Sequence, residues 1–88
     1  MIRRRVVVHG FVQGVFFRET VRRRVLEHDV AGWVRNNPDG TVEAVFEGHR
    51  GSVEALVGLC RKGTRGARVD RVDVVDEEPE GLDGFAIR

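Results

Sequence analysis

The sequence predicts an α+β sandwich, in which two helices pack on one face of a mainly antiparallel sheet. Valine-rich segments and helix-period segments follow one another in the order strand, helix, strand, strand, helix, strand, with a short strand at the end. A strong turn signal joins the second and third strands directly and makes them a hairpin. With 88 residues, the chain suits one domain, residues 1–88, with one core.

The first strand is expected over Arg3–His9, where three consecutive valines without strict alternation are typical of a central strand covered on both faces. Residues Gly10–Gly14 interrupt this strand. A helical pattern follows, because apolar residues recur at the spacing of one helix face. These residues are Phe17, Val21 and Val25.

A hairpin is predicted in the middle of the chain. Its first strand is expected over Gly32–Asn36, and the turn over Asn37–Gly40, where proline presets one backbone angle and glycine accepts a positive φ. The segment Thr41–Glu47 then alternates apolar and polar residues, which predicts a strand with one buried face.

The second helix is expected to begin at Ser52, whose hydroxyl is a plausible N-cap, and to end at Gly63. Its apolar face has the i, i+3, i+4, i+7 spacing of a helix. The residues on this face are Val53, Leu56, Val57 and Cys60. We therefore expect the Cys60 thiol to be a small core group rather than a nucleophile.

A further strand is expected over Ala67–Asp76, and a short edge strand over Phe85–Arg88. Val69 is out of phase with Val72 and Val74, which indicates a bulge or a frayed start. Two helices cannot cover both faces of such a sheet, so we expect them on one face. Right-handed crossovers then favour a ferredoxin-like βαββαβ sandwich.

The composition excludes several classes of protein. A net charge of +1 provides no overall attraction for nucleic acid or an acidic membrane. No apolar run approaches the roughly 20 residues that span a bilayer, and the valines after Arg3–Arg5 are too few for a signal peptide. Because Cys60 is the only cysteine, neither an internal disulfide nor a cysteine-rich zinc site can form. We expect a cytoplasmic protein that binds neither nucleic acid nor a membrane.

Charged residues nevertheless cluster in the sequence. Two basic clusters lie at Arg3–Arg5 and Arg22–Arg24, and an acidic segment runs over Asp76–Asp83. We expect these clusters to be solvated surfaces.

The segment Gly10–Arg18 lies between the first strand and the first helix. Its glycines allow a tight turn that brings N–H groups inward, and the helix start adds unpaired N–H groups and the positive end of a dipole. The guanidinium of Arg18 can fold over this loop and match two phosphate oxygens. The loop has neither the Gly-Lys-Ser/Thr ending of a Walker P-loop nor the third glycine of a dinucleotide fingerprint. The pattern indicates an anion site, with a solvated arginine beside a glycine-rich connection as the alternative.

The segment Gly10–Arg18 resembles the acylphosphatase signature, G-x-V-Q-G-V-x-F-R. The second signature of that family, G-W-V-x-N followed by D-G-x-V-E, is matched by Gly32–Asn36 and Asp39–Glu43. The resemblance continues through Ala67–Asp70 to the closing Phe85–Ile87, and so covers essentially the whole chain.

One position departs from the family pattern. Many members carry a basic residue where this chain has Phe11. We expect this change to weaken the long-range attraction of a substrate and to leave the backbone of the loop intact.

The resemblance implies the ferredoxin-like fold and the hydrolysis of acyl phosphates to a carboxylate and inorganic phosphate, without a metal or cofactor. By the same resemblance, Arg18 binds the phosphate and Asn36 orients the attacking water. The backbone that would form the phosphate loop belongs to Val12, Gln13, Gly14, Val15 and Phe16. The expected ligands are a small-molecule acyl phosphate and, as product-like anions, phosphate or sulfate. We expect a monomer.

Other residues have chemistry to offer near these motifs. His9 could be a base or a second anion contact, although a histidine paired with the backbone at a strand end is favoured. Glu19 could orient Arg18, although an acid in a first helical turn is already favoured by the helix dipole. Trp33 is expected to pack under the second strand, and Asn37 to belong to the turn.

Alternatives to a free-standing enzyme remain. RNA-recognition motifs share the expected topology and stack bases on strand aromatics, but the third strand here combines Phe46 with Glu43 and Glu47, which would repel RNA. A domain serving a larger hydrogenase-maturation protein and a member of the family without turnover are two further alternatives. The lack of an attached domain and the presence of both Arg18 and Asn36 favour the active, free-standing enzyme.

Overall fold

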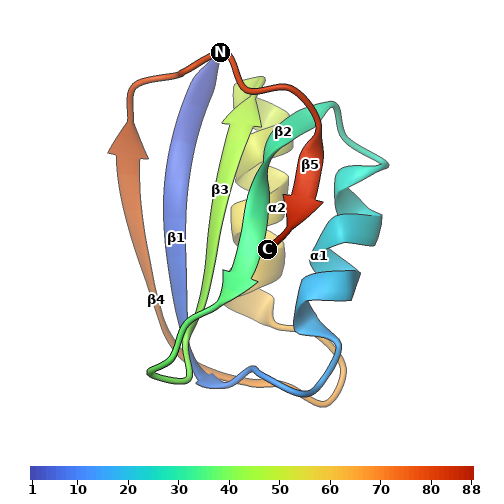
Figure 1. The fold of residues 1–88 in the computed structure, drawn as a ribbon, viewed down its shortest axis with the longest axis vertical. Helices are drawn as coiled ribbons and strands as arrows, with labels where there is room; N and C mark the ends of the chain where they lie inside the picture. The colour runs from blue at the N-terminus through green and yellow to red at the C-terminus, as the bar shows by residue number, and fades with distance from the viewer.

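Five strands form one sheet, and two helices lie against one of its faces (Figure 1). All 88 residues are described by the structure, a computed structural model. The elements in chain order are β1 (Ile2–Phe11), α1 (Phe17–Val25), β2 (Val30–Asn36), β3 (Val42–Gly48), α2 (Arg50–Lys62), β4 (Arg68–Glu77) and β5 (Phe85–Ile87).

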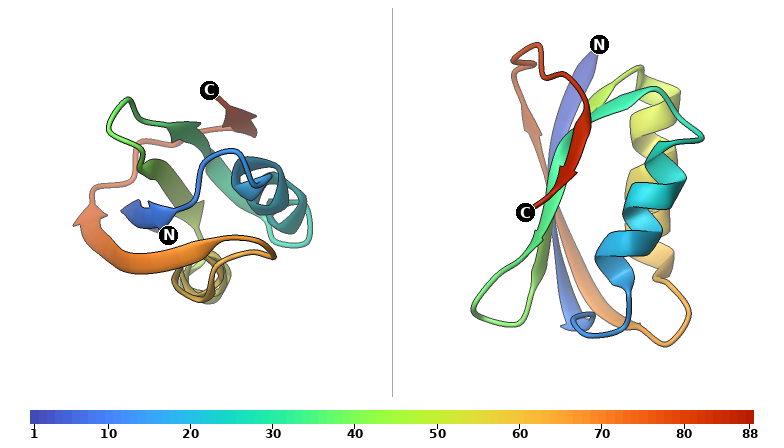
Figure 2. Two further views of the ribbon diagram at one scale, coloured as in Figure 1. Left: turned by 90° about the horizontal axis from the view of Figure 1, so that it is seen from below. Right: turned by 45° about the vertical axis from the view of Figure 1, so that its right-hand side comes forward.

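The strand order in the sheet is β4-β1-β3-β2-β5. The pairs β1–β3, β1–β4 and β2–β3 are antiparallel, while β5 runs parallel to β2 at the edge. Each helix therefore connects two strands that lie on either side of a third strand, as a βαβ crossover requires. The right-hand view of Figure 2 shows both helices on the same side of the sheet. The predicted ferredoxin-like sandwich with a short closing strand is confirmed.

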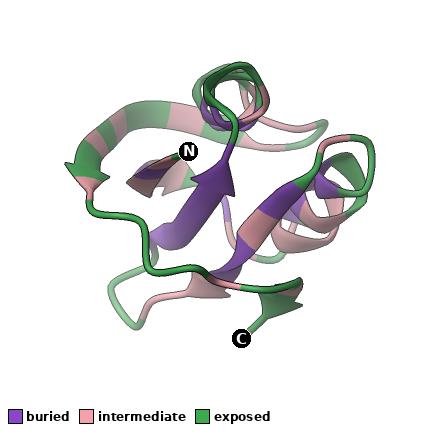
Figure 3. Cartoon of the chain, turned by 90° about the horizontal axis from the view of Figure 1, so that it is seen from above, coloured by how far each residue is buried: buried purple, intermediate pink, exposed green.

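The hydrophobic core lies between the sheet and the two helices, where Figure 3 shows the buried segments of the chain facing one another. The helical periodicity identified the buried residues of both helices correctly. They are Phe17, Val21 and Val25 on α1 and Val53, Leu56, Val57 and Cys60 on α2. Each of these side chains contributes to stability through burial, and truncating a fully buried leucine such as Leu56 typically costs about 2–5 kcal/mol.

Strand β3 differs from its prediction, because both of its faces are buried. Val42, Ala44 and Phe46 belong to the core beneath the helices. Glu43 and Glu47, on the opposite face, are also buried, although no helix covers them. The prediction of one buried face for Thr41–Glu47 is therefore wrong, because side chains from neighbouring strands cover the other face.

Strand β1 is central in the sheet, as predicted, but helices cover only one of its faces. Val6 and Val8 lie in the core, whereas Arg3 and Arg5 alternate with them and lie on the helix-free face. Val7 on that face is partly exposed. The expectation of a strand covered on both faces by the core is thus corrected.

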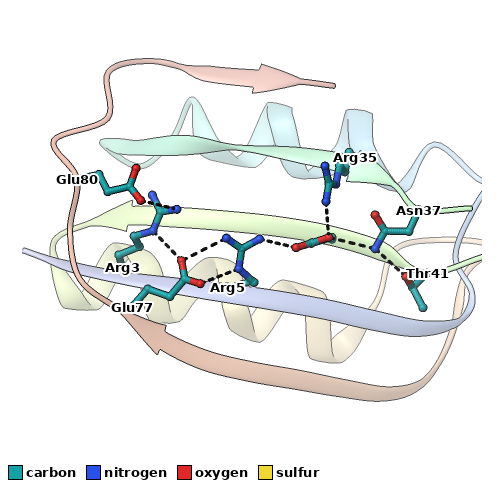
Figure 4. Close-up of polar contacts among 8 residues, drawn as sticks. Arg3, Arg5, Arg35, Asn37, Thr41, Glu77 and Glu80 are labelled. Atoms are coloured by element: carbon teal, nitrogen blue, oxygen red, sulfur yellow. Dashed lines mark hydrogen bonds and ion pairs between the residues drawn. The ribbon is translucent and has the colours of Figure 1, made fainter. Parts of the chain in front are cut away.

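Ion pairs cover much of the helix-free face, as Figure 4 shows. Arg3, only 5% exposed, donates to Glu77 (2.8 Å) and lies 3.4 Å from the carboxylate of Glu80. Arg5 donates to the same Glu77 at 2.7 Å and also pairs with Glu43. The N-terminal basic cluster and the C-terminal acidic segment are therefore partners rather than two separate solvated surfaces.

Glu47 anchors the segment between β4 and β5. It is 2% exposed and accepts hydrogen bonds from the backbone amides of Glu80 (2.6 Å) and Leu82 (2.7 Å). Burial alone would raise the pKa of this carboxyl, but the two amides and the charge of Arg3 outweigh that effect and hold its pKa below the ordinary value. The anchored segment leads the chain back to pair β5 with β2.

Trp33 lies on the helix-free face, where three arginines surround its ring. The guanidinium carbons of Arg88, Arg35 and Arg5 lie 4.6, 5.0 and 5.5 Å from the ring centroid. These are cation–π distances. Trp33 is buried, as predicted, but arginines rather than apolar core residues cover it.

Two local predictions concern element ends. The bulge is confirmed, because His9 and Gly10 of β1 pair with Arg71 and Val69 of β4, which leaves one extra residue on β4. The N-cap at Ser52 is wrong. The helix α2 already begins at Arg50, after an extended His49 that makes no side-chain cap.

Candidate active site

Apolar side chains anchor the loop between β1 and α1 to the hydrophobic core. Val12 is buried, and Val15 packs against the core. Gly14 has φ of 74°, which glycine adopts readily. Phe16 has φ of 58° and ψ of 26°, a left-handed conformation that is unfavourable for a bulky residue by roughly 1–2 kcal/mol. The loop thus combines a well-packed base with strained backbone at the start of the helix.

The amides of this loop have no acceptors within the protein. No backbone N–H from Val12 to Phe16 donates to another backbone group, and no side chain caps the start of α1. The first N–H groups of a helix have no partner within the helix. Together, the loop and the helix start provide a group of free donors beside the positive end of the α1 dipole, which favours an anion.

A cavity of about 290 Å³ lies at this loop. Eight residues line it: Val12, Gly14, Phe16, Phe17, Arg18, Glu19, Asn36 and Ile87. The structure therefore brings Arg18 and Asn36, which are 18 residues apart in the sequence, to one cavity. Of the predicted loop residues, Gln13 and Val15 do not line it.

Arg18 lies in the first turn of α1 and is partly exposed. Its only hydrogen bond is a long one, 3.4 Å, from Nη1 to the backbone oxygen of Arg88. Glu19 does not orient it, since that carboxylate pairs with Arg22 (2.6 Å) and Arg23 (3.6 Å). The hydrogen bond from Arg22 holds the pKa of Glu19 below its usual value. No aspartate or glutamate side chain therefore neutralises the charge of Arg18.

Asn36 is the last residue of β2. Strand alternation places it on the same face as Val34, which lies in the core beneath the helices, and this is the face where α1 begins. Its backbone pairs with Val42 of β3, which fixes its position. The carboxamide makes no hydrogen bond within the protein, unlike that of Asn37. It is free to bind a ligand or a water molecule.

The side chain of Gln13 joins the loop to the β2–β3 turn. Its Nε2 donates to the backbone oxygens of Asn37 (2.8 Å) and Thr41 (2.9 Å). Asn37 in turn donates to the Thr41 hydroxyl (3.0 Å) and to Glu43 (3.1 Å), which confirms its place in the turn. This link holds the loop at a fixed distance from the strand end that carries Asn36. The sequence predicted the backbone of Gln13 as part of the phosphate loop, but it did not predict this link made by the side chain.

Glu43 supports the same turn from the helix-free face, where it accepts hydrogen bonds from Arg5, Arg35 and Asn37. Burial acts to raise its pKa, but these three donors outweigh burial, and its pKa lies below the usual value. The turn is therefore supported by an ionised carboxylate.

Three other candidates lie outside the cavity. His9 pairs with the Asp73 carboxylate at 2.9 Å, on the helix-free face, so the expected backbone partner is wrong. Phe11 is exposed at the end of β1, opposite Arg68. Cys60 is buried in the core, as expected, and burial raises its pKa to about 12.

Three lining residues were not part of the site predicted from the sequence, namely Phe17, Glu19 and Ile87. Phe17 was predicted only as a buried residue of the first helix. Ile87 reaches the cavity because β5 pairs with β2, with Ile87 opposite Val34. The sequence indicates an edge strand there, but not which edge of the sheet it joins. Glu19 was identified only as a partner of Arg18, although it lines the cavity itself.

No three His, Cys, Asp or Glu side chains come together closely enough to hold a metal ion. The positive charge that the protein itself offers to a ligand in the cavity comes from Arg18 and the helix start.

Neither helix is both long and apolar enough to cross a membrane.

Comparison with known proteins agrees with this architecture. The sequence model of the family described as acylphosphatase matches residues 4–87. An acylphosphatase of Natronomonas pharaonis is 54% identical over 87 residues, which cover 99% of this chain and 95% of that protein. The crystal structure of acylphosphatase from Bacillus subtilis superposes with a TM-score of 0.95 at 34% identity, covering 100% of this chain and 99% of the other.

The same fold also occurs inside a much larger protein. A structure of full-length HypF in a phosphate- and nucleotide-bound form matches with a TM-score of 0.91 at 26% identity, over 99% of this chain but only 12% of HypF. The two acylphosphatases, by contrast, match over nearly their whole length. The chain belongs to the acylphosphatase family.

Proposed function

We propose that this protein hydrolyses acyl phosphates in the cavity between the Val12–Phe16 loop and the end of β2. The observation that carries the proposal is the meeting of three features in one cavity: loop amides without acceptors, an arginine without an aspartate or glutamate partner, and a free carboxamide. The family assignment supports the same reaction.

The phosphoryl group is bound by the loop and by Arg18. The free amides from Val12 to Phe16 are directional donors for phosphate oxygens, and the start of α1 adds favourable dipole charge. The guanidinium of Arg18 neutralises charge on the equatorial oxygens, which is the main electrostatic demand of phosphoryl transfer.

Asn36 positions the attacking water. A carboxamide cannot take up a proton near neutral pH, but it can hold a water molecule in line with the bond that breaks. The water oxygen attacks phosphorus, the bond from phosphorus to the acyl oxygen breaks, and the carboxylate leaves with the electron pair. The proton of the water passes to a phosphate oxygen of the substrate, so no protein base is needed. The leaving group is a weak base and needs no general acid.

We further propose that the reaction needs neither metal nor cofactor, and that the protein acts in the cytoplasm as a monomer without binding nucleic acid or membranes. Arg18 supports metal independence, since it provides a fixed positive charge in the cavity. The net charge of +1 agrees with the absence of a polyanionic partner. Phosphate or sulfate should bind as product-like anions.

RNA binding is not supported by any contact on the sheet. Phe46, the aromatic residue of β3, is fully buried beneath the helices. On the helix-free face, β3 presents Glu43 and Glu47, and the ring of Trp33 is covered by arginines. A base could not stack on these strands without rearranging that face.

The test is hydrolysis of benzoyl phosphate in excess chelator by the wild type and three variants. Arg18→Ala should lose activity by about a thousandfold, because a charged donor to the transition state is removed. Asn36→Ala should lower kcat more than it weakens inhibition by inorganic phosphate, because it removes positioning rather than charge. Arg23→Ala is the matched control, since this exposed arginine of the same helix lies outside the cavity and should retain activity.

Full turnover by Asn36→Ala would show that the carboxamide does not position the water. Activity that appears only after a metal is added would contradict the mechanism as a whole. Inhibition by phosphate that is not competitive with benzoyl phosphate would place product binding outside the proposed loop.

A further inference from the structure

Two large apolar side chains lie exposed at the proposed site. Phe16 is 80% exposed and Ile87 is 38% exposed, and both line the cavity that contains Arg18 and Asn36. Neither belongs to the hydrophobic core. Because folding buries little of the Phe16 ring, core packing does not account for its presence at the cavity.

The backbone holds Phe16 in place despite its conformation. A left-handed conformation is most easily adopted by glycine, yet an aromatic residue occupies the position. Its carbonyl accepts hydrogen bonds from both the amide and the hydroxyl of Thr20, each at 3.0 Å. The first turn of α1 therefore fixes the point from which the ring extends.

Ile87 is held by a different element. It lies opposite Val34 in the parallel β2–β5 pair, and the next amide, that of Arg88, donates to the Val34 oxygen at 2.9 Å. The cavity thus receives one apolar side chain from the start of α1 and another from the closing strand. Both are present without any rearrangement of the backbone.

The cavity is lined by one basic and one acidic residue. Arg18 is the only basic residue that lines it, and the proposed reaction assigns that charge to the phosphoryl group. Glu19 is the only acidic residue that lines it. A second negative charge on the substrate would find no lining cation of its own, because Arg22 and Arg23, which lie outside the lining, are paired with Glu19.

We propose that the acyl part of the substrate is neutral and apolar, an aryl or alkyl group that contacts Phe16 and Ile87. Acyl phosphates whose acyl part carries a carboxylate or a second phosphate are disfavoured, because the cavity lining supplies no second cation for that charge. This inference rests on the proposed hydrolysis of acyl phosphates, and it specifies which substrates of that class the site selects.

The test compares kcat/KM for benzoyl, 4-carboxybenzoyl and acetyl phosphate within each enzyme. Ratios between substrates cancel any change in binding of the shared phosphoryl group. Phe16→Gly removes the ring at a backbone conformation that glycine adopts easily, and Ile87→Ala shortens the other contact. Leu26→Ala is the matched control, because Leu26 is an apolar residue directly after α1 that is 75% exposed and lies outside the cavity.

The ratio of benzoyl to acetyl phosphate should fall about two- to tenfold in Phe16→Gly, the effect expected of one aromatic contact. It should fall less in Ile87→Ala and stay constant in Leu26→Ala. In the wild type, 4-carboxybenzoyl phosphate should be a poorer substrate than benzoyl phosphate. Glu19→Gln should narrow that difference by a few-fold, because it leaves the positive charges of Arg22 and Arg23 unpaired beside the cavity.

Unchanged ratios in both Phe16→Gly and Ile87→Ala, with hydrolysis intact, would overturn the acyl contact and leave the proposed function standing. Preference for the carboxylated substrate in the wild type would overturn the charge argument. Failure of the wild type to hydrolyse any of the three substrates would overturn the proposed function together with this inference.

Discussion

Replacing Gln13 with methionine should reduce both turnover and stability, although methionine is similar in size to glutamine and is also uncharged. The Gln13 carboxamide donates to the backbone oxygens of Asn37 and Thr41 at 2.8 and 2.9 Å. Each of these oxygens retains one backbone donor, at 3.1 and 2.8 Å, after the change. The loss should therefore lie near the low end for two hydrogen bonds, about 1–2 kcal/mol in the free energy of unfolding.

The effect on turnover follows from geometry. Gln13 links the loop to the turn that follows Asn36, so its loss loosens the placement of the carboxamide relative to the bound phosphoryl group. A shift of about 1 Å between reacting groups can lower a rate by about a hundredfold. We expect kcat to fall by about ten- to a hundredfold, while the inhibition constant of phosphate, set mainly by Arg18 and the loop amides, changes much less.

The assay combines urea unfolding with steady-state hydrolysis of benzoyl phosphate. Gln13→Glu is the informative companion, because it keeps the shape of the side chain but places a carboxylate, which cannot donate, against two carbonyl oxygens. It should be less stable than Gln13→Met at neutral pH. Wild-type kcat and stability in Gln13→Met, or a fully stable Gln13→Glu, would refute the role of this side chain as a link.

The remaining predictions concern stability. Gly32→Ala should destabilise the protein by at least about 3 kcal/mol in urea unfolding, because its Cβ would lie 1.8 Å from the Val45 oxygen; Gly58→Ala, in open space on α2, should stabilise it by about 0.5–1 kcal/mol. Acid should destabilise the fold below about pH 4.5, since the folded pKa of Glu47 is lowered from 4.5 and its contribution is lost as pH falls through the folded value. Glu47→Gln should weaken this pH dependence, and an unchanged unfolding curve between pH 7 and pH 3 would contradict it. Alkali should also destabilise the fold, through Cys60: burial raises the folded pKa of its thiol to about 12, above the ordinary thiol value of 9.0, so stability should fall above pH 9 by up to about 1.4 kcal/mol per pH unit. Rapid labelling of the native thiol at pH 8 would show that Cys60 is not buried.

The features that the sequence predicted are those that local patterns determine. The buried faces of both helices follow from apolar spacing alone, and the predicted residues match the structure. The out-of-phase Val69 correctly indicated a bulge, because an extra residue in a strand must shift the alternation. The motifs, through their resemblance to a family, predicted that Arg18, Asn36 and the loop share one site.

The features that the sequence did not predict depend on contacts between distant segments. Glu43 and Glu47 looked like the solvent side of β3, because alternation cannot show that arginines from β1 cover them. The position of Ile87 depends on which sheet edge β5 joins, which no local pattern specifies. Ser52 failed as a cap because the helix begins where the chain leaves β3, before the residue with the best capping chemistry.

The arginine-covered tryptophan has an experimental consequence. Trp33 is the only tryptophan in the chain, so intrinsic fluorescence comes from a single known position. One of the three cations over its ring belongs to Arg88, directly after β5, and Ile87 of that strand lines the cavity. Emission from this indole should therefore report whether the closing strand is docked, and it offers a label-free optical signal for ligand-induced changes at that wall of the cavity.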